Sequence, residues 1–404
     1  MSSDRSLPLA GLTVVELGNI VAAPFASVIL ADLGAEVVKV ERPGVGDIVR
    51  NTGDSGQSII YAFSRNKRSI ALDLKSSEGR TAYRDLVADA DVVVENLGPG
   101  VTDRLGIGYE DLREANPGLV YLSIKGFMRG SYGDRPGMDM VAESMSGLSA
   151  MTGRPGGKPL RVGTSIADIG AALYGVIGVL TALRARDRTG EGQRIDASLF
   201  ESAVQWMGYW ITHADMTGQD HPALGSSHPS FALYDIFETN EPNEWVFVGV
   251  TSERHWPAFC RATGMTELLA DERFETVAAR LHHESELIRE VQEELSTWDR
   301  EKLLAALLEE SVPVAPVNKP SDLLHDSHLR ETGLLVDIFD DQHGSAESLR
   351  TPLTPIRGSR TTTRQRRDPP KLGEHSREIL RELGYDANEI AELVAADIVG
   401  EPDE

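Results

Sequence analysis

Asp168 is the residue of this sequence best placed for covalent chemistry. It is the one charged residue of the stretch 163–183, and fifteen uncharged residues rich in Ala, Gly, Leu and Val follow it. An aspartate at such a position is most often an N-cap, which accepts hydrogen bonds from the first free N–H groups of a helix. A carboxylate held there stays ionised and can also serve as a nucleophile, so both roles are open.

The stretch after Asp168 predicts a buried helix that is too short to span a bilayer. Apolar residues recur in it at helical spacing: Leu173, Val176, Ile177, Leu180 and Leu183. Glycines on another face permit close backbone contact: Gly170, Gly175 and Gly178. We therefore expect Asp168 to stand at the start of a core helix.

Positive charges recur near the ends of the early predicted strands, at Arg42, Lys75 and Arg104. Ligands of open α/β sheets bind at the carboxyl ends of the strands, so cations collected there suit an anionic, phosphate-bearing ligand. Each cation taken alone could equally be a solvated charge at a strand end. Three at equivalent positions in an acidic protein favour the ligand.

The sequence lacks the motifs of several common nucleotide-binding, hydrolytic and metal sites. The first strand-to-helix turn, LGNIVAAPFA, lacks the G-x-G-x-x-G of dinucleotide-binding proteins. Neither a phosphate-binding P-loop nor a G-x-S-x-G nucleophile elbow occurs. The pair His282-His283 belongs to no metal-ligand spacing, so we predict no metal site.

Composition narrows the class further. Acidic residues outnumber basic ones 63 to 40, for a net charge of −23, which disfavours nucleic-acid binding. Dispersed acid with scarce lysine fits a salt-adapted cytoplasm, or an ordinary acidic protein, about equally well. Cys260 is the single cysteine, so no intramolecular disulfide forms and a reducing compartment fits. Because the N-terminus does not resemble a signal peptide, we expect a soluble, cytoplasmic protein.

Strand-like and helical patterns alternate along the first half of the chain. Strand patterns cover 12–18, 36–41, 69–74, 91–96 and 119–127, and helical patterns cover 22–33, 76–89, 109–115, 138–150, 166–186 and 199–215. This rhythm predicts an α/β fold with a doubly wound, mostly parallel sheet. The expected domains are a large domain (1–215), a linker (216–230), a smaller inserted α/β domain (231–330) and a return to the large domain (331–404).

Several motifs together resemble the class III CoA-transferases, the family of formyl-CoA and carnitine CoA-transferases. They are ELGNIVAAPFASVILADLGAEVVKVERPGVGD, NKRSIALDLK, VVVENLGPGVTDRLG, RPGMDMVAESMSGLSAMTG, PLRVGTSIADIGAALYGVIGVLTAL and PPKLGEHSREIL. The resemblance implies an interlaced homodimer with coenzyme A as a substrate and no tightly bound cofactor. It makes Asp168 the nucleophile, which forms an anhydride and then an aspartyl-CoA thioester. The implied CoA contacts are Ala22, Arg42, Leu72, Lys75, Asn96, Leu97, Gly98, Val101 and Arg104.

Departures from the family pattern bear on the substrate. Formyl-CoA transferases carry a glutamine for oxalate where this chain has Val21, so formate and oxalate are not the expected substrates. The α-methylacyl-CoA racemases of the same fold use the histidine of a G-H-D motif, which here reads Gly137-Met138-Asp139. Methionine cannot move a proton, and Asp139 should point away if 138–150 is helical.

The prediction is thus a transferase that moves CoA from an acyl-CoA such as succinyl-CoA to a small carboxylic acid, for example a dicarboxylate such as mesaconate or citramalate. The alternatives are a 2-methylacyl-CoA racemase and a non-catalytic acyl-CoA-binding protein. An acceptor carboxylate needs a cation, for which Arg50, Arg154 and Arg161 are candidates. Backbone N–H groups at the start of the Asp168 helix, or near Gly225, could stabilise oxyanions.

Overall fold

The computed structural model describes residues 7–339 and 348–402, which form two compact units. The larger unit consists of residues up to 148, 162–211 and 327 onward, and the smaller one of 149–161 and 212–326. The smaller unit therefore includes 149–161, a stretch well ahead of the predicted boundary at 215.

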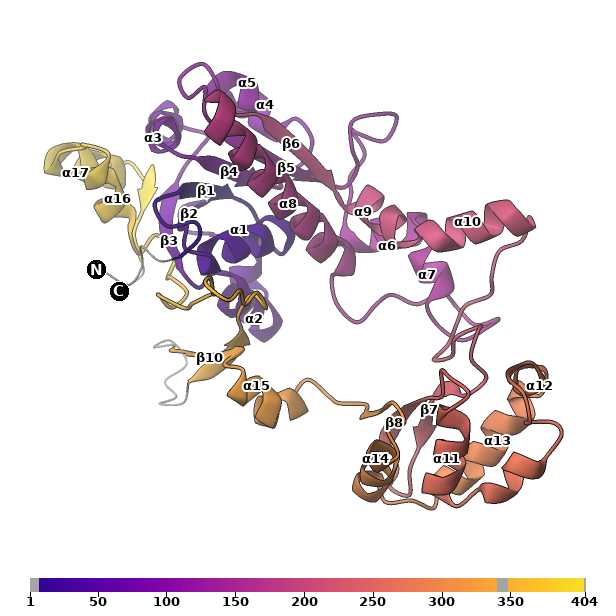
Figure 1. Ribbon diagram of the computed structural model, residues 1–404. Coiled ribbons are helices and arrows are strands. Elements are labelled where there is room, and N and C mark those ends of the chain that lie inside the picture. Colours follow the sequence, from indigo (N-terminus) through magenta and orange to yellow (C-terminus); the bar gives the residue numbers. More distant parts are fainter. Residues whose placement is uncertain (1–6, 340–347, 403–404) are drawn as a thin grey trace. The chain divides into compact units, whose positions relative to one another are not determined.

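A seven-stranded sheet is the centre of the larger unit (Figure 1). Its strand order is β12-β3-β2-β1-β4-β5-β6, and only β12 is antiparallel to its neighbour, so the predicted doubly wound, mostly parallel α/β fold is confirmed. Near-continuous runs of Val, Ile and Leu form the central strands because both faces of the sheet are covered. The strands are β1 (Thr13–Leu17), β2 (Glu36–Glu41), β3 (Lys67–Leu72), β4 (Val92–Glu95), β5 (Val120–Lys125), β6 (Arg194–Ser198) and β12 (Val399–Gly400).

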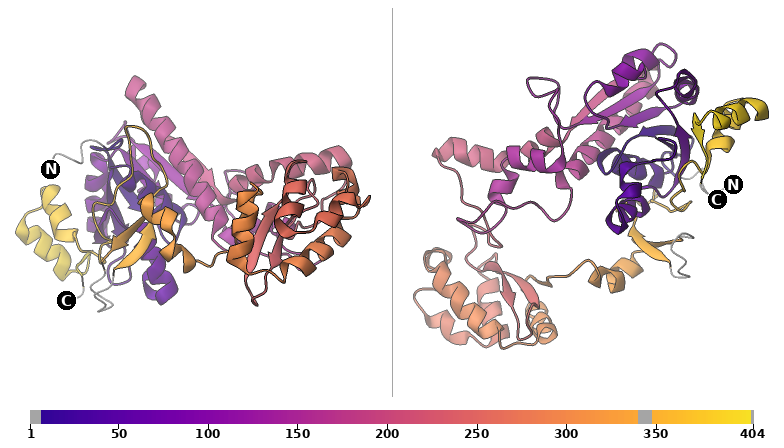
Figure 2. Two further views of the ribbon diagram at one scale, coloured as in Figure 1. Left: turned by 60° about the horizontal axis from the view of Figure 1, so that its bottom comes forward. Right: turned by 180° about the vertical axis from the view of Figure 1, so that it is seen from behind.

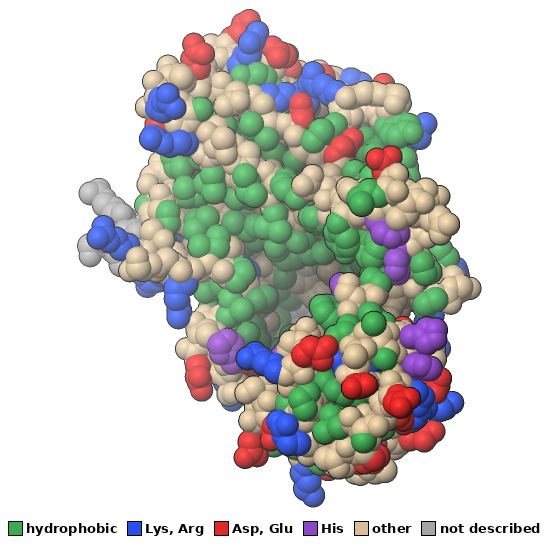
Figure 3. All heavy atoms as spheres, turned by 45° about the vertical axis from the view of Figure 1, so that its right-hand side comes forward, with side chains coloured by type: hydrophobic (Ala, Val, Ile, Leu, Met, Phe, Trp, Pro, Cys, Tyr) green, Lys and Arg blue, Asp and Glu red, His purple; other side chains and the backbone are tan. Residues whose placement is uncertain are grey.

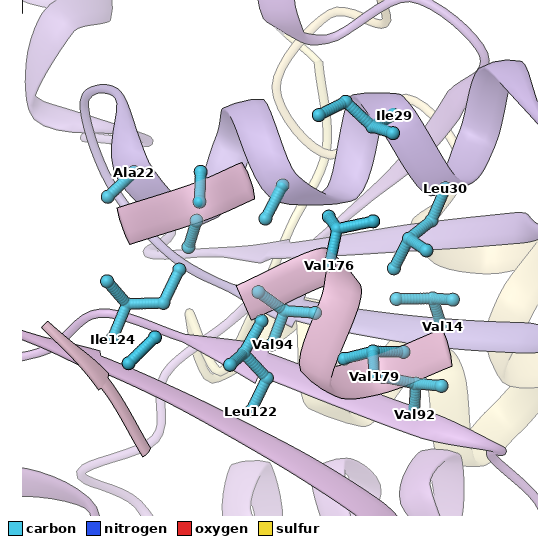
Figure 4. Close-up of a cluster of buried hydrophobic side chains, with 14 of the residues drawn as sticks. Val14, Ala22, Ile29, Leu30, Val92, Val94, Leu122, Ile124, Val176 and Val179 are labelled. Carbon is cyan, nitrogen blue, oxygen red and sulfur yellow. The ribbon is translucent and has the colours of Figure 1, made fainter. Parts of the chain in front are cut away.

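Helices cover both faces of this sheet (Figures 1 and 2). On one face, α1 (Ala22–Asp32) and α8 (Ile166–Thr189) pack against each other and against the sheet, and Figure 4 shows Val176 and Val179 of α8 among Val92, Val94 and Leu122. The other face is covered by α3 (Ser77–Ala88), α5 (Tyr109–Leu112), α16 (Ser376–Glu382) and α17 (Ala387–Ala395).

Glycines seat α8 on its neighbours, as the sequence predicted. A Cβ added to Gly170 would lie 2.0 Å from the Trp206 ring, and one on Gly178 would lie 2.6 Å from Ile195. These distances leave no room for a side chain, so the backbone of α8 lies directly on strand and helix side chains.

Two expectations for α8 are wrong. The helix has 24 residues and is long and apolar enough, by length and composition, to cross a membrane, although half of its most apolar window is buried inside the protein. It is also not buried all round, because Leu173, Ile177 and Leu180 are 46, 58 and 37% exposed. Spacing showed that these side chains share a face but not that this face is open.

Two predicted helices are each interrupted. The stretch 138–150 divides at Gly147, whose φ of +86° ends the first piece, and 199–215 divides at Met207. The resulting helices are α6 (Asp139–Met145), α7 (Leu148–Met151), α9 (Leu199–Trp206) and α10 (Gly208–Thr217). Two further helices lie earlier in the chain, α2 (Asp54–Phe63) and α4 (Val101–Leu105).

The C-terminal part of the chain is tied to the larger unit by buried polar contacts. The Asp32 carboxylate accepts hydrogen bonds from Arg65 and Asn66, and also from the backbone N–H and hydroxyl of Thr354 at 2.9 Å each. The elements of this part are α15 (Ser327–Glu331), the hairpin β10 (Leu335–Ile338) and β11 (Leu349–Pro352), α16, α17 and β12. Asp386 caps α17 by accepting from the N–H groups of Asn388 and Glu389, whereas residues 340–347 and 403–404 of the predicted return lie outside the described residues.

The smaller unit has a three-stranded antiparallel sheet with its own apolar core. Its strands are β7 (Tyr234–Glu238), β8 (Trp245–Gly249) and β9 (Val314–Pro316), and its helices are α11 (His255–Thr263), α12 (Val277–His282), α13 (Glu284–Leu295) and α14 (Arg300–Glu309). Cys260 is buried in this core as a free thiol.

Candidate active site

A cavity of about 460 Å³ lies at the carboxyl ends of β1, β4 and β5 in the larger unit. The chain leaves β1 toward β2 and leaves β4 toward β5, so the strand order reverses between them. Open α/β sheets bind their ligands at such a switch point. The cavity is lined by Ala22, Asn96, Leu97, Gly98, Pro99, Val101, Arg104, Ile124, Lys125, Gly126, Asp134, Arg135, Pro136, Gly137, Asp168 and Leu199.

The start of the loop after β4 is held by two side chains, Asn96 and Lys125. The Asn96 amide accepts a hydrogen bond from Asn19 N–H and donates one to Asn19 C=O, each at 2.9 Å. Lys125 Nζ lies 2.6 Å from Glu95 Oε2 and 2.5 Å from the Leu97 carbonyl. These contacts preorganise the backbone at the start of the loop.

A buried charge cluster supports the turn between β1 and α1. Glu16 accepts from Lys39 at 2.7 Å and from Lys67 at 2.6 Å, and Lys39 also contacts Asp47 at 3.0 Å. Asp47 in turn accepts from the backbone N–H of Ile20, whose φ is +66°. Sequence reasoning missed this cluster, although an acid and a lysine within two valine-rich strands were its signal.

The side chains of this cluster stay ionised because each contacts a group of opposite charge. Burial alone would raise the pKa of Glu16, but the charges of Lys39 and Lys67 outweigh it and lower that pKa to about 2. Lys67 lacks a second carboxylate, and burial together with the charge of Lys39 lowers its pKa to about 8 despite the contact with Glu16. The turn beside the cavity thus rests on ionised groups that water does not reach.

Asp168 is the third residue of α8 and not its N-cap, which is Ser165. The expectation that Asp168 caps its own helix is therefore wrong, and its half-buried carboxyl group is available to the cavity. Burial, and secondarily the charge of Asp139, raise the pKa of Asp168 to about 7. Both effects favour the protonated form, whereas the expectation from the sequence was a carboxylate kept ionised by the helix N-terminus.

Asp139 does not point away from Asp168, contrary to expectation. Its Oδ1 accepts from the backbone N–H of Ala167 at 2.9 Å and is 3.4 Å from that of Asp168. The neighbouring N–H groups of Ile166 and Ile169 bond to backbone carbonyls, and Gly225 N–H bonds to Gly153 C=O. The donors expected to stabilise an oxyanion are thus already used in the structure.

The structure brings most of the predicted site residues together. Seven line the cavity: Ala22, Asn96, Leu97, Gly98, Val101, Arg104 and Asp168. The other three lie outside this lining, since Leu72 is buried in the core and Arg42 and Lys75 are exposed at the ends of other strands. Met138, which stands where the racemases have histidine, is 69% exposed and is not among the lining residues.

The arginines considered for binding the acceptor carboxylate differ in their contacts. Arg50 makes a bidentate pair with Glu41, at 2.7 and 2.9 Å, which accounts for its guanidinium group. Arg154 and Arg161 belong to the smaller unit. Sequence reasoning missed Arg135, which lines the cavity. Its guanidinium lies 4.1 Å from the Tyr132 ring centre, and it takes part in none of the ion pairs of residues 7–339 and 348–402.

Within those same residues, no cluster of His, Cys, Asp and Glu suits a metal ion.

Comparison with known proteins identifies the family of the chain. The family model for CoA-transferase family III matches residues 9–376. A succinyl-CoA:mesaconate CoA-transferase of Haloarcula hispanica is 36% identical over 93% of this chain and 96% of its own, and a succinate–glutarate CoA-transferase of Agrobacterium fabrum is 36% identical over 94 and 96%. A solved CaiB/BaiF family protein from Brucella suis has a TM-score of 0.85 and 35% identity, over 93% of this chain and 99% of its own. The predicted family, the transferase class and the CoA thioester substrate are confirmed: the chain belongs to CoA-transferase family III.

Proposed function

We propose that this enzyme transfers CoA from succinyl-CoA to a second small dicarboxylate, with Asp168 as the covalent nucleophile. The observation that carries the proposal is the Asp168 carboxyl group, which does not cap α8 and shares one cavity with the loop 96–98 and Arg104. The substrate class follows from the relatives, whose names pair succinate or its thioester with mesaconate or glutarate. All of these acids carry two carboxyl groups.

The proposed reaction consists of four acyl transfers. The Asp168 carboxylate attacks the thioester carbonyl, which forms a mixed anhydride and releases CoA thiolate. The thiolate attacks the aspartyl carbonyl of that anhydride, which gives the aspartyl-CoA thioester and frees the donor acid. The acceptor carboxylate then attacks this thioester, again releasing thiolate. Finally the thiolate attacks the acceptor carbonyl of the second anhydride, which yields the new acyl-CoA and regenerates Asp168.

A panel of acids tests the substrate class. We expect succinyl-CoA to transfer CoA to glutarate, mesaconate or citramalate much faster than to monocarboxylic acids of similar length such as butyrate, measured by mass spectrometry of the CoA products. Equal rates with the mono- and dicarboxylates would contradict the proposal that the second carboxylate is recognised.

Two arginines of the cavity are expected to act on different substrates. We predict that Arg104→Ala raises the KM for succinyl-CoA, since Arg104 has a carbonyl contact at 3.3 Å but no carboxylate partner among the described ion pairs. Arg135→Ala should instead raise the KM for the acceptor acid. Loss of one charge-assisted bond typically costs about 1.5–3 kcal/mol, or roughly ten- to a hundredfold.

Steady-state kinetics with each substrate varied in turn checks this division. Arg113→Ala is the matched control, because Arg113 is exposed and pairs with Glu110 on the surface, and its KM values should stay unchanged. Unchanged KM values in both cavity variants would show that neither arginine binds substrate.

We also propose that the enzyme is a homodimer in which α8 is covered by the second copy. Hydrophobic side chains form a broad patch on one face of the molecule (Figure 3). The exposed apolar residues of α8 are Leu173, Tyr174, Ile177 and Leu180. Apolar side chains clustered in this way typically mark an interface, and the family resemblance points to an interlaced partner.

Ile177→Glu is expected to convert the dimer to monomer or to abolish soluble expression, because it places a charge in the middle of this apolar face. The molar mass measured by size-exclusion chromatography with light scattering checks it. Leu308→Glu is the control, since Leu308 is 60% exposed, similar to Ile177 at 58%, and lies in the smaller unit. A parent protein that elutes as a monomer, or a dimeric Ile177 variant, would contradict the proposal.

A further inference from the structure

Asp139 stands in an unusual relation to the proposed nucleophile. Asp139 is the first residue of α6 and is only 9% exposed. Its side chain reaches across to α8. Its Oδ1 accepts from Ala167 N–H at 2.9 Å, with Asp168 N–H at 3.4 Å. The N-cap residue Ser165 makes no such bond with its own side chain. The cap of α8 therefore comes from a different helix.

We propose that Asp139 is a positioning residue for the transfer reaction: its carboxylate caps the first turn of α8 and places a second negative charge beside Asp168. The inference rests on the proposed role of Asp168 as nucleophile. Helix caps normally come from the residue just before the helix, and a neutral Ser, Thr or Asn serves there as well as an acid. A neutral acceptor would hold the turn equally well, so the charge is the distinguishing property of Asp139.

The charge has a direct consequence for the chemistry. Two carboxyl groups near each other favour the protonated form of one of them, and burial acts in the same direction, which together raise the pKa of Asp168 to about 7. Only the ionised carboxylate attacks a thioester, so the rate should fall as the pH drops through 7. A carboxylate of raised pKa is also a stronger nucleophile once it is ionised.

The other acidic side chains of α6, α9 and α1 have hydrogen-bond or ion-pair partners of their own. On α6, Glu143 Oε2 accepts from Val162 N–H at 2.9 Å. On α9, Glu201 accepts from the Ser198 hydroxyl, and α1 carries only Asp32, which pairs with Arg65. The charged side chains that share the cavity lining with Asp168 are Arg104, Lys125, Asp134 and Arg135.

The test measures how fast CoA becomes attached to the full-length protein after mixing with succinyl-CoA, from pH 5 to 9. The variants are Asp139→Asn, which keeps the acceptor oxygen and removes the charge, and Asp139→Ala, which removes both. For the parent we expect a midpoint near 7. For Asp139→Asn the midpoint should move down by about one unit, which makes the ratio of the attachment rate at pH 6 to that at pH 9 about fivefold higher than in the parent.

The remaining variants separate charge from structure. Asp139→Ala should show the same lowered midpoint together with a melting temperature lower by a few degrees. Glu143→Gln removes a neighbouring carboxylate of α6 and should keep the parent midpoint. A parent-like midpoint in Asp139→Asn, with the adduct still forming, overturns the inference alone. Failure of the parent protein to form any adduct overturns the proposed function beneath it.

Discussion

Asp168→Asn is expected to abolish CoA transfer while leaving the fold and the affinity for CoA nearly unchanged. Asparagine has almost the same shape, but its amide cannot attack a thioester to form an anhydride, so every later step is lost. We expect kcat to fall by at least about a thousandfold, as is usual when a covalent nucleophile is removed. Steady-state transfer assays and calorimetric titration with CoA check the two parts of this prediction.

A second aspartate of the same helix provides the control. Asp187 is exposed in the last turns of α8, and Asp187→Asn should transfer CoA at the parent rate. Residual activity of Asp168→Asn within tenfold of the parent would rule out the covalent mechanism.

Among the substitutions considered, Glu16→Gln is expected to lower the free energy of unfolding the most. The substitution leaves the buried ammonium groups of Lys39 and Lys67 without the carboxylate they share, and only Lys39 keeps a second one, Asp47. Breaking a buried ion pair from one side typically costs about 3–5 kcal/mol. Urea unfolding of the two proteins measures the difference.

The surface pair of Glu110 and Arg113, with an N–O distance of 2.8 Å, is the matched control. Glu110→Gln should change the free energy of unfolding by less than about 1 kcal/mol, because exposed ion pairs contribute little. A similar small loss for Glu16→Gln would show that the buried cluster does not stabilise the protein.

The pH dependence of stability follows from the sign of the Glu16 shift. Its pKa is lowered from 4.5 to about 2, so its contribution is fully present above 4.5 and is lost as the pH falls toward 2. The Glu16→Gln variant should therefore lose less stability than the parent between pH 4.5 and 2.

Much of the larger unit was predictable because its signals are local. Valine-rich strands alternate with stretches of apolar residues at helical spacing, and the strand order that results places the loop 96–98 and Asp168 at one switch point. The resemblance added the roles of the site residues, which periodicity alone could not supply. The cytoplasmic location and the salt-adapted surface stay predictions, because a fold does not record where a protein works.

What the sequence did not reveal depends on contacts between distant segments. Asp139 caps a helix that begins 27 residues later, and no short-range pattern encodes such a bond. The cluster of Glu16, Lys39 and Lys67 likewise joins three strands. The open face of α8 escaped notice because apolar spacing is the same whether the neighbour is the chain's own core or another subunit.

The most direct test of the account is to identify the covalent intermediate. The parent enzyme is mixed with succinyl-CoA in the absence of an acceptor acid, quenched with acid, digested, and analysed by mass spectrometry. If Asp168 is the nucleophile, the peptide containing it gains the mass of coenzyme A less one water, and Asp168→Asn gives no such peptide. Transfer to an acceptor without any CoA-modified peptide, or with the modification on another residue, would contradict the account.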